Sequence, residues 1–435
     1  MKTVKIGLCG LGTVGSGTVQ VLSRNRHEIE ASANCHIELA HVGARRDNPK
    51  CHLPENVKLS RDIFAVVDDP DIDIVVELIG GTTVAKELVL KAIANGKHVV
   101  TANKALIAEC GNEIFTAADN ANVCIAFEAA VAGGIPIIKT LREGLAANKI
   151  DWLVGIINGT GNFILTEMAE KGRGFAEVLQ QAQQLGYAES DPTFDVEGID
   201  AAHKLVILAA IAFGMPLQFE KVYTEGISHI EAQDIAYADE LGYRIKHLGI
   251  ARRVEDEVQL RVHPTLIPKK RLLAHVHGVM NAVMVHGNAV GSTLYSGPGA
   301  GAEPTASAVI ADVIDIARNL ADGSTPLVPH LGYASDFVNT IQIQAMAALE
   351  TAYYLRLSVL DQPGVLSDIT QILSKQGISI EALIQKEPDE DQETVPVIIL
   401  TNRAIEGKMA EAILHIEQLD TVTSQVARIR VESLN

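Results

Sequence analysis

A dense group of charged residues stands directly before a strongly apolar segment in the middle of the chain. Residues 186–205 read GYAESDPTFDVEGIDAAHKL, and the residues from Leu205 through Phe213 are wholly apolar. Asp200 and Lys204 are four residues apart, so both would lie on one face of a helix. An exposed ion pair is the alternative, but charges at the start of a buried helix are costly unless they are used. We therefore predict a site at Asp200 and Lys204, and we interpret His203, which would point elsewhere, as structural.

A glycine motif near the N-terminus predicts a dinucleotide site. Gly10, Gly12 and Gly15, with Thr13 and Val14 between the last two, form a G-x-G-x-x-G pattern between an apolar run and a helical pattern. The first glycine allows a tight turn, the second lets the backbone approach a pyrophosphate, and the third lets helix and strand pack closely.

The residues after the next apolar run bear on the choice of dinucleotide. NAD sites usually place an acidic residue at the end of the second strand. Here residues 36–44 are followed by Arg45 and Arg46 instead. A guanidinium group suits a 2′-phosphate, so the sequence favours NADP. NAD stays possible, because both arginines could simply be solvated.

Three shorter motifs are weaker. The first motif, Thr101 to Lys104, ends an apolar run. Lys104 could there hold a carboxylate or position the nicotinamide ribose, or it could be an ordinary surface lysine. In the second, Glu128–Pro136, one carboxylate and several backbone carbonyls could suit a hard cation. The third, residues 296–305, is a glycine-rich approach to a helix that could close over a cofactor or anion, or be a plain loop.

The elements that must position these residues change along the chain. In the first part of the chain, apolar runs alternate with helical patterns, which is typical of a parallel sheet covered on both faces. The apolar runs are 4–9, 36–44, 71–80, 97–103 and 122–131. The middle of the chain is expected to form an α+β block. Its expected elements are a strand at 150–160, helices over 161–215, and strands near 258–263 and 272–294. Residues 305–322 have helical spacing with Thr305 as the expected N-cap.

The last part of the chain has the order βαββαβ, which is the ferredoxin-like pattern. We therefore predict an α/β protein whose domain organisation is as follows: a Rossmann-type doubly wound nucleotide-binding domain at 1–130 plus about 303–325, an α+β catalytic and dimerisation domain at 131–302, a linker at 326–351, and the ferredoxin-like domain at 352–435. The acidic run at 387–393 reads as a solvated loop.

Composition excludes several functional classes. At roughly 150 residues per domain, 435 residues suggest about three domains. The formal charge of −18, from 36 basic and 54 acidic residues, argues against nucleic acid and anionic membranes as partners. Five cysteines without a Cys-x-x-Cys pair make a disulfide framework or a cysteine zinc site improbable. The longest apolar stretch, Leu205–Met215, falls short of the about 20 residues that a bilayer needs. We expect a cytoplasmic protein with neither a membrane nor nucleic acid as partner.

Taken together, these motifs resemble the homoserine dehydrogenase family with a C-terminal ACT domain. The matching stretches are GLGTVG at 10–15, TANK at 101–104, EAAVAGGIPII at 128–138, NGTGNF at 158–163, residues 186–205 and GPGAG at 297–301. DQPGVL at 361–366 is similar to the ACT signature. The resemblance implies reduction of L-aspartate 4-semialdehyde to L-homoserine by NAD(P)H, on the route to threonine, methionine and isoleucine.

The resemblance also implies a role for each matching residue. Lys204 would be the general acid, and Asp200 its partner and a substrate ligand. Glu189 would bind the substrate ammonium beside the nicotinamide, and Lys104 would lie near substrate and cofactor. The remaining matches are residues that shape the substrate pocket (Thr160, Tyr187 and Asp195), further cofactor contacts (Gly186, Gly301 and Thr101), and a monovalent cation site, sodium in the family (Glu128 with the backbone carbonyls of Val131, Gly133 and Ile135).

An ACT domain implies amino-acid binding, with threonine the expected effector near Asp361–Val365. ACT modules commonly pair, and the exposed sheet edge of a single module also favours a homodimer or homotetramer. Two alternatives stay open. One is another ACT-containing dehydrogenase, acting on a hydroxy acid, which would usually need a catalytic histidine. The other is a non-catalytic NAD(P)H-binding amino-acid sensor, which would not need the motif at 186–205.

Overall fold

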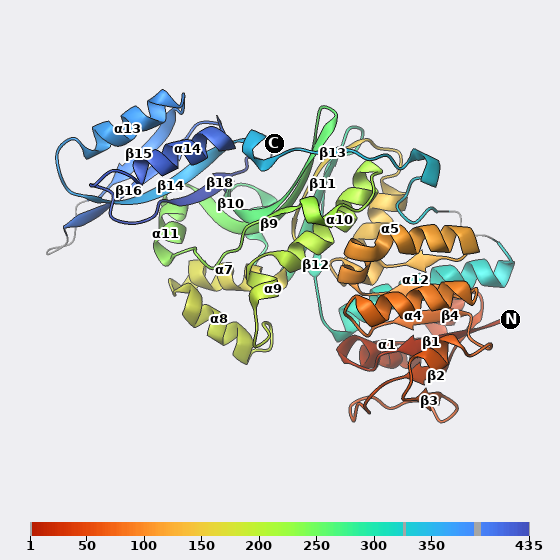
Figure 1. Ribbon diagram of the computed structural model, residues 1–435. Helices are drawn as coiled ribbons and strands as arrows, with labels where there is room; N and C mark the ends of the chain where they lie inside the picture. Colours follow the sequence, from red (N-terminus) through yellow and green to blue (C-terminus); the bar gives the residue numbers. More distant parts are fainter. Residues whose placement is uncertain (1, 325–327, 387–392, 435) are drawn as a thin grey trace.

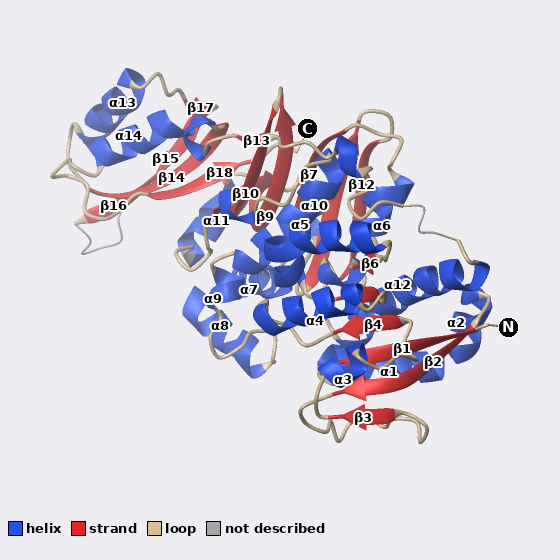
Figure 2. Ribbon diagram, turned by 45° about the vertical axis from the view of Figure 1, so that its right-hand side comes forward, coloured by secondary structure: helices blue, strands red, loops and turns tan. Residues whose placement is uncertain are grey.

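Two sheets organise the computed structural model, which describes residues 2–324, 328–386 and 393–434. The N-terminal part forms a parallel sheet with helices on both faces (Figure 1). The middle and C-terminal parts share a longer mixed sheet, whose C-terminal strands lie far from the first sheet (Figure 2). Among the described residues, no helix combines the length and the hydropathy needed to cross a membrane.

The first sheet has the order β3-β2-β1-β4-β5-β6, with every neighbouring pair parallel. The strand order reverses between β1 and β4, so the crevice at their carboxyl ends is where a doubly wound sheet binds its ligand. The strands are β1 (Thr3–Cys9), β2 (His36–Gly43), β3 (Lys58–Ser60), β4 (Ile74–Glu77), β5 (His98–Thr101) and β6 (Ile125–Ala126). The helices are α1 (Thr13–Arg24), α2 (Arg26–Ala33), α3 (Phe64–Val67), α4 (Thr83–Ala94) and α5 (Lys104–Ala121).

Helices cover both faces of this sheet because its strands are apolar on both sides. Val75 of β4 packs in the cluster that contains α4 and α5, whereas its neighbours Ile74 and Val76 pack in the cluster beneath α1. Helix α12 (Ala302–Asp322) returns to the second cluster and lies against α1. A Cβ atom on Gly17 would come within 2.6 Å of the Ala302 carbonyl oxygen, so the two helices touch at that glycine.

The second sheet has the order β12-β11-β7-β9-β10-β18-β14-β16-β15, and β8, β13 and β17 pair beside this path. One face of its first half packs against the apolar helix α10 (Ile199–Phe213). The strands of that half are β7 (Ile150–Ile156), β8 (Tyr223–Thr224), β9 (Tyr243–Val254), β10 (Glu257–Pro268), β11 (Met280–Gly287), β12 (Gly291–Pro298) and β13 (Gln342–Ile343). Its other helices are α6 (Ile137–Lys139), α7 (Gly159–Lys171), α8 (Phe175–Gln184), α9 (Thr193–Val196) and α11 (Ala232–Glu240). Short helical turns are η1 (Glu128–Ala130), η2 (Thr140–Gly144), η3 (Phe219–Lys221), η4 (Leu272–His275), η5 (Ser335–Phe337) and η6 (Met346–Ala348).

The C-terminal module continues this sheet. Its strand order β18-β14-β16-β15 is that of a ferredoxin-like unit, and α13 and α14 pack together with its strands in one apolar cluster. Strand β18 pairs in parallel with β10, with Leu266 opposite Val431. One edge of the module is therefore occupied by the same chain, while β15 lies at the free edge. The elements are β14 (Glu350–Leu360), α13 (Val365–Lys375), β15 (Ile380–Gln385), β16 (Thr394–Thr401), β17 (Ala404–Ile405), α14 (Glu406–Ile416) and β18 (Ala427–Val431).

Several sequence predictions differ from the structure in their elements. Strands β3 and β9 were not predicted, because β3 is too short and charged residues interrupt the apolar pattern of β9. The strand expected at 122–131 ends at Ala126, and η1 follows it. The expected strand at 272–294 is instead η4, β11 and the start of β12.

The prediction of Thr305 as a helix cap was wrong. Helix α12 begins three residues earlier, its N-cap is Gly301, and Thr305 is buried inside the helix. Pro304 is compatible with a first turn, where a backbone N–H has no partner within the helix. The predicted acidic loop lies almost wholly outside the described residues, as do the first two residues of the predicted linker.

Candidate active site

A carboxylate between two lysines forms the centre of the site. Lys204 Nζ lies 2.7 Å from Asp200 Oδ2, and Lys104 Nζ lies 3.1 Å from Asp200 Oδ1. Asp200 and Lys204 are one turn apart on α10, whereas Lys104 is the first residue of α5, beyond the carboxyl end of β5. The structure thus joins the predicted pair to the lysine of a separate motif, at the crevice edge of the first sheet.

Asn158 holds this centre from a third direction. Its Nδ2 donates to Asp200 Oδ2 at 2.9 Å and to Asp195 Oδ1 at 2.8 Å. Its Oδ1 accepts the N–H of Gly161, so the same side chain caps α7. Lys204 Nζ also donates to the Ile157 carbonyl oxygen at 2.7 Å. The end of β7 therefore determines where the amine and both carboxylates lie.

The two carboxylates differ in their electrostatic environment. Burial opposes ionisation of Asp200, but Lys204 and Lys104 outweigh it and hold its pKa below the ordinary value. Burial raises the pKa of Asp195, and the nearby Asp200 adds to this effect. Asp200 is thus held as an anion that fixes two ammonium groups, while Asp195 is the easier of the two to protonate.

A glycine places Asp200 at the start of α10. Gly198 precedes the helix with φ +82°, a left-handed conformation that disfavours a side chain. A Cβ atom there would also lie 3.0 Å from His247 and from Val262. The helix can therefore begin close against the sheet, which brings Asp200 into the buried interior.

The loop from Gly186 to Ser190 lies beside this centre, although its side chains are mostly exposed. Thr160 donates its hydroxyl to the Tyr187 carbonyl oxygen at 2.7 Å, and the Tyr187 ring packs edge-on against Phe163. Gly186 and Glu189 are exposed. Within the described ranges, no hydrogen bond or ion pair joins the Glu189 side chain to the two lysines or to Asp200. The structure brings Thr160, Asp195 and Tyr187 together near the centre, but it does not bring the Glu189 carboxylate into contact with it.

A second buried carboxylate organises the strand ends of the first sheet. Glu77, the last residue of β4, accepts N–H groups from Ile79 and Gly80 and the hydroxyl of Thr101. Thr101 in turn accepts the N–H of Asn103, whose side chain caps α5. Burial raises the pKa of Glu77. The Thr101 hydroxyl therefore acts within this network and helps to fix the start of the helix that carries Lys104.

The three glycines of the motif differ in their surroundings: two are closely packed, and one faces open space. Gly10 has φ +106°, and a Cβ atom there would lie 2.5 Å from the Leu78 carbonyl oxygen. A Cβ atom on Gly15 would lie 2.1 Å from the Gly10 carbonyl oxygen, so this glycine allows the helix to pack closely. Around Gly12 no atom lies within 4 Å of such a position. The open space is at the glycine whose backbone is expected to approach the pyrophosphate, and Thr13 and Val14 begin α1 beside it.

Arg45 and Arg46 follow the carboxyl end of β2 and are exposed. No ion pair between described residues uses either of them. Their neighbour Arg61 is already paired with Asp47 at 2.8 Å. The two guanidinium groups are therefore available at the place where the second strand of a dinucleotide-binding fold reaches the ribose.

The Glu128 loop is held tightly by backbone groups. Each carboxylate oxygen of Glu128 accepts one N–H, from Ile138 and from Lys139, at 2.8 Å. Burial, with Asp312 nearby, raises its pKa to about 7. The structure holds no group of three or more His, Cys, Asp or Glu side chains, within its described part, that could bind a metal ion. A cation here would depend on backbone carbonyls.

The 297–301 loop packs against this segment. A Cβ atom on Gly133 would lie 2.7 Å from the Gly299 carbonyl oxygen, and the N–H of Gly134 donates to Pro298. Backbone N–H groups of described residues donate to the carbonyls of Glu128 and Ile135, but to neither that of Val131 nor that of Gly133. Gly301 is the N-cap of α12. Two separately predicted motifs are thus one structural unit.

Sequence reasoning gave no role to two central residues. Asn158 belongs to a stretch that the resemblance already included, and Glu77 ends a buried strand. A polar residue at the carboxyl end of a parallel strand could have identified Glu77, and an asparagine directly before a helical pattern could have identified Asn158 as a helix cap. His203 was interpreted as structural: its Nε2 lies 3.0 Å from Glu109 Oε1, and its ring stacks on Phe219.

The comparisons with known proteins cover the whole architecture. Residues 10–128 match the family model described as homoserine dehydrogenase, NAD binding domain, and residues 136–314 match the one described as homoserine dehydrogenase. Residues 353–417 match the ACT domain model.

Relatives of the full chain carry the same description. The chain is 61% identical over 435 residues to homoserine dehydrogenase of Pseudomonas aeruginosa, with 100% of both chains covered. A crystal structure of a homoserine dehydrogenase from Thiobacillus denitrificans has a TM-score of 0.95 at 58% identity and covers 100% of this chain and 99% of that one. A hyperthermophilic archaeal homoserine dehydrogenase in complex with NADPH has a TM-score of 0.61 at 26% identity, covering 72% of this chain and 97% of that one.

Proposed function

Because this chain belongs to the homoserine dehydrogenase family, whose reaction it shares, we propose that Asp200, Lys204 and Lys104 form its catalytic centre. The reaction is the reversible reduction of L-aspartate 4-semialdehyde to L-homoserine, and the chain is an oxidoreductase with a nicotinamide cofactor. The observation that carries our assignment is the buried Asp200 carboxylate with an ammonium group on each of its oxygens.

The proposed role of Lys204 follows from the charge that the reaction creates. NAD(P)H, when bound, supplies the hydride that converts the aldehyde carbon to an alkoxide carbon. A proton donor beside that oxygen lowers the barrier, and a positive charge there stabilises it. Lys204 Nζ can do both, because Asp200 and the Ile157 carbonyl oxygen fix its position. In homoserine oxidation the same amine accepts the proton.

The other site residues are proposed to bind and orient the substrate. Asp200 and Lys104 would contact it directly, and Thr160, Tyr187 and Asp195 would shape the pocket around it. Glu189 would hold the substrate ammonium and lie beside the nicotinamide. In the structure no hydrogen bond or ion pair between described residues joins its carboxylate to the two lysines or to Asp200, so in this role Glu189 would meet the centre only through the bound substrate.

Steady-state oxidation of L-homoserine with NADP or NAD tests the function directly. A sensor without catalysis would bind the cofactor and give no turnover. A hydroxy-acid dehydrogenase would turn over a hydroxy acid such as L-lactate in preference to L-homoserine. Neither alternative is favoured by the family that the chain belongs to.

NADP is the proposed preferred cofactor, and Arg45 and Arg46 are its proposed specificity residues. Replacing both with alanine is expected to raise KM for NADPH by roughly 10- to 100-fold, because each charge-assisted hydrogen bond to a 2′-phosphate is lost. KM for NADH is expected to change little. Arg61→Ala is the matched control, since this arginine is in the same region but already pairs with Asp47. Equal effects on both cofactors would contradict the assignment.

Gly10, Gly12, Thr13, Val14 and Gly15 are proposed to hold the pyrophosphate, with Thr101, Lys104, Gly186, Glu189 and Gly301 as further cofactor contacts. The fit rests on the open space at Gly12 and on the start of α1 beside it. Support for Gly301 comes from α12, which it caps and which lies against α1.

A monovalent cation, sodium, is proposed at Glu128 and the backbone carbonyls of Val131, Gly133 and Ile135. Support comes from the buried carboxylate and from the carbonyls of Val131 and Gly133, which accept no backbone N–H from described residues. At constant ionic strength, activity is expected to be higher in sodium chloride than in choline chloride. The same rate in both salts, after dialysis against choline chloride, would contradict the site.

We further propose threonine feedback through the ACT module and a homodimer or homotetramer. Among the described strands, β12 and β15 lie at the two ends of the strand order, which leaves room for strand pairing with a second copy. Inhibition of the full chain by L-threonine and its mass in solution by light scattering test these two statements. A monomeric mass would contradict the oligomer, and an unchanged rate in threonine would contradict the feedback.

A further inference from the structure

Asn158 joins the two carboxylates of the catalytic centre through one amide group. Its Nδ2 donates one hydrogen to Asp200 Oδ2 and the other to Asp195 Oδ1, while its Oδ1 accepts the N–H of Gly161 at 2.6 Å. Because a backbone N–H can only donate, this last contact fixes which end of the amide faces the carboxylates. Burial raises the pKa of Asp195, and the hydrogen bond from Asn158 works against that shift.

The oxygen of Asp200 that accepts from Asn158 is also the one that holds the catalytic amine. Lys204 Nζ donates to Asp200 Oδ2 and to the Ile157 carbonyl oxygen, each at 2.7 Å. No further acceptor among the described residues reaches this amine, so its third hydrogen is left for a substrate oxygen. The amide hydrogen bond stabilises the negative charge on Asp200 Oδ2, so this carboxylate attracts the ammonium less strongly than it would without that bond.

Few other charges act on this group of residues. Among the described residues, Lys104 of α5 and Asp195 of α9 are the charged side chains that bond to Asp200 or share its amide partner. The titratable rings around the start of α10 are His203, on the helix itself, and His247, which contacts Gly198 from β9. Burial lowers the pKa of His247 to about 4, and it lowers the pKa of His203 despite the nearby Glu109. Both rings are therefore neutral above pH 7.

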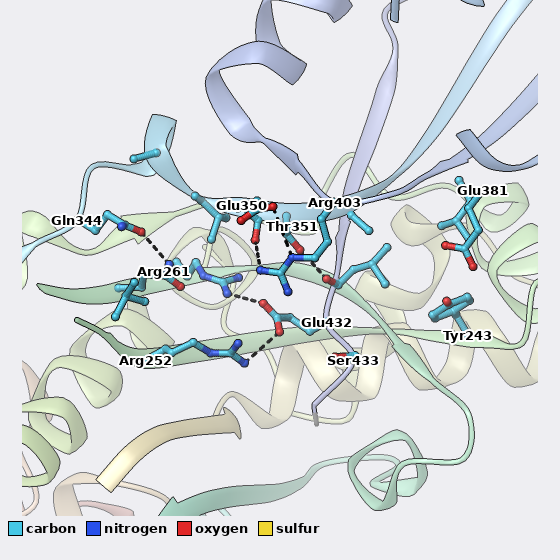
Figure 3. Close-up of a pocket in the computed structure, with 17 residues that line it drawn as sticks. Tyr243, Arg252, Arg261, Gln344, Glu350, Thr351, Glu381, Arg403, Glu432 and Ser433 are labelled. Carbon is cyan, nitrogen blue, oxygen red and sulfur yellow. Dashed lines mark hydrogen bonds and ion pairs between the residues drawn. The ribbon is translucent and has the colours of Figure 1, made fainter. Parts of the chain in front are cut away.

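A buried carboxylate elsewhere in the chain is bound by a different set of partners. Between the catalytic sheet and the C-terminal module, Glu432 pairs with Arg252 at 3.3 Å and with Arg261 (Figure 3). A guanidinium keeps its charge throughout the pH range of a folded protein, so such a pair exchanges no proton. At the catalytic centre the partners are two lysines and an uncharged amide. The amide satisfies the carboxylate oxygens without adding a fixed cation beside the amine that must gain and lose a proton.

We propose that Asn158 is a positioning residue that sets the pH at which Lys204 exchanges its proton. It does so by sharing its two N–H groups between Asp195 and Asp200, which limits how strongly the carboxylates hold the ammonium. The inference rests on the proposed function, in which Lys204 is the general acid of reduction and the general base of oxidation. It assigns to Asn158 an electrostatic role in addition to its role as the cap of α7.

Asn158→Asp separates these two roles. The new carboxylate can still accept the N–H of Gly161 and cap the helix, but it donates no hydrogen and adds a negative charge beside Asp200. Oxidation needs the neutral amine, so the acid limb of kcat/KM for L-homoserine is expected to move to higher pH by about one unit. At a pH below the limb this is about a tenfold loss of rate. The alkaline limb of aspartate-semialdehyde reduction, which needs the ammonium, is expected to move in the same direction.

Two further variants complete the experiment. Asn158→Ser keeps a good cap residue without adding charge, and it is expected to move both limbs in the same direction by a smaller amount, because one hydroxyl cannot donate to two carboxylates. Asn162→Asp is the matched control on the same helix. Asn162 is equally buried, but its amide bonds to backbone carbonyls and to Lys246 at 3.1 Å. Its limbs should coincide with those of the unaltered chain, and circular dichroism would show that each variant is folded.

Two results would overturn the proposal. If both Asn158 variants lose the same factor in rate at every pH while the limbs stay in place, Asn158 is a structural cap and nothing more. If the limbs move to lower pH, the amide strengthens the hold on the ammonium instead of limiting it. A failure of the proposed function looks different, since the unaltered chain would then oxidise no L-homoserine at any pH.

Discussion

Replacing Lys204 with alanine is expected to lower kcat for homoserine oxidation by about 10²- to 10⁴-fold. That is the usual contribution of a positioned general acid or base. The affinity for NADPH, measured by fluorescence titration, is expected to stay close to that of the unaltered chain, because our assignment places Lys204 at the substrate oxygen and not among the pyrophosphate contacts. The fold should persist, because Lys104 still neutralises Asp200.

Two comparisons separate catalysis from packing. Lys171→Ala removes an exposed i,i+4 ion pair with Glu167 in the same catalytic block and should leave kcat unchanged. Methylamine, added to Lys204→Ala, should restore part of the activity by occupying the vacated position. A Lys204→Ala enzyme with near-normal turnover would show that another group transfers the proton.

Replacing Arg430 with methionine is expected to lower the free energy of unfolding by about 3–5 kcal/mol, which is the usual cost of removing one partner from a buried ion pair. The Arg430 side chain is fully buried and bonds to Glu225 of the catalytic block at 2.7 Å and to Glu406 of α14 at 2.5 Å. The residue therefore holds the C-terminal module to the catalytic sheet. Urea unfolding followed by circular dichroism would measure the loss.

The matched control is Arg428→Met. Arg428 lies on the same strand and contacts Glu406 at 2.9 Å, but it is about a quarter exposed, so its loss should cost much less. If the two variants were equally stable, Arg430 would not be the residue that holds the C-terminal module to the catalytic sheet.

The loss of unfolding free energy in Arg430→Met should also depend on pH. Burial opposes ionisation of Glu225 and Glu406, but Arg430 outweighs it and holds the pKa of each carboxyl below its ordinary value. The contribution of these two carboxylates to stability is thus fully present above the pKa of about 4.3 that a glutamate has in the unfolded chain. It is lost as the pH falls below that pKa. The difference in unfolding free energy between Arg430→Met and the unaltered chain should stay nearly constant from pH 7 to about pH 5 and narrow as the pH falls below about 4.3.

The parts of the fold that the sequence predicted best are those with local signals. The glycine motif between an apolar run and a helical pattern predicted β1 and α1, and alternation predicted the parallel sheet. The expected return of 305–322 to the first domain also has a structural counterpart in the packing of α12 on α1. Strand β9 escaped prediction because five basic residues interrupt its apolar pattern, although most of its residues are buried by long-range packing.

The candidate site likewise contains residues that local spacing in the sequence indicated and residues that it did not. Asp200 and Lys204 are one helical turn apart, so spacing alone indicated that they would meet. Lys104 and Asn158 reach the same carboxylate from 96 and 42 residues away, and no periodicity in the sequence encodes such distances. The continuity of the C-terminal module with the catalytic sheet was likewise invisible, since β18 and β10 are joined only in the folded chain.

The pairing of β18 with β10 has a consequence for synthesis of the chain on the ribosome. The edge of β10 near Leu266 receives its partner only when Val431 of β18 has been made. Domains generally fold as units while the chain emerges, N-terminal part first, and an unpaired strand edge is prone to aggregation. The catalytic sheet must therefore keep an open edge while the chain grows from Leu266 to Val431. We expect premature termination in the last strand to give aggregates more readily than a soluble, unregulated enzyme.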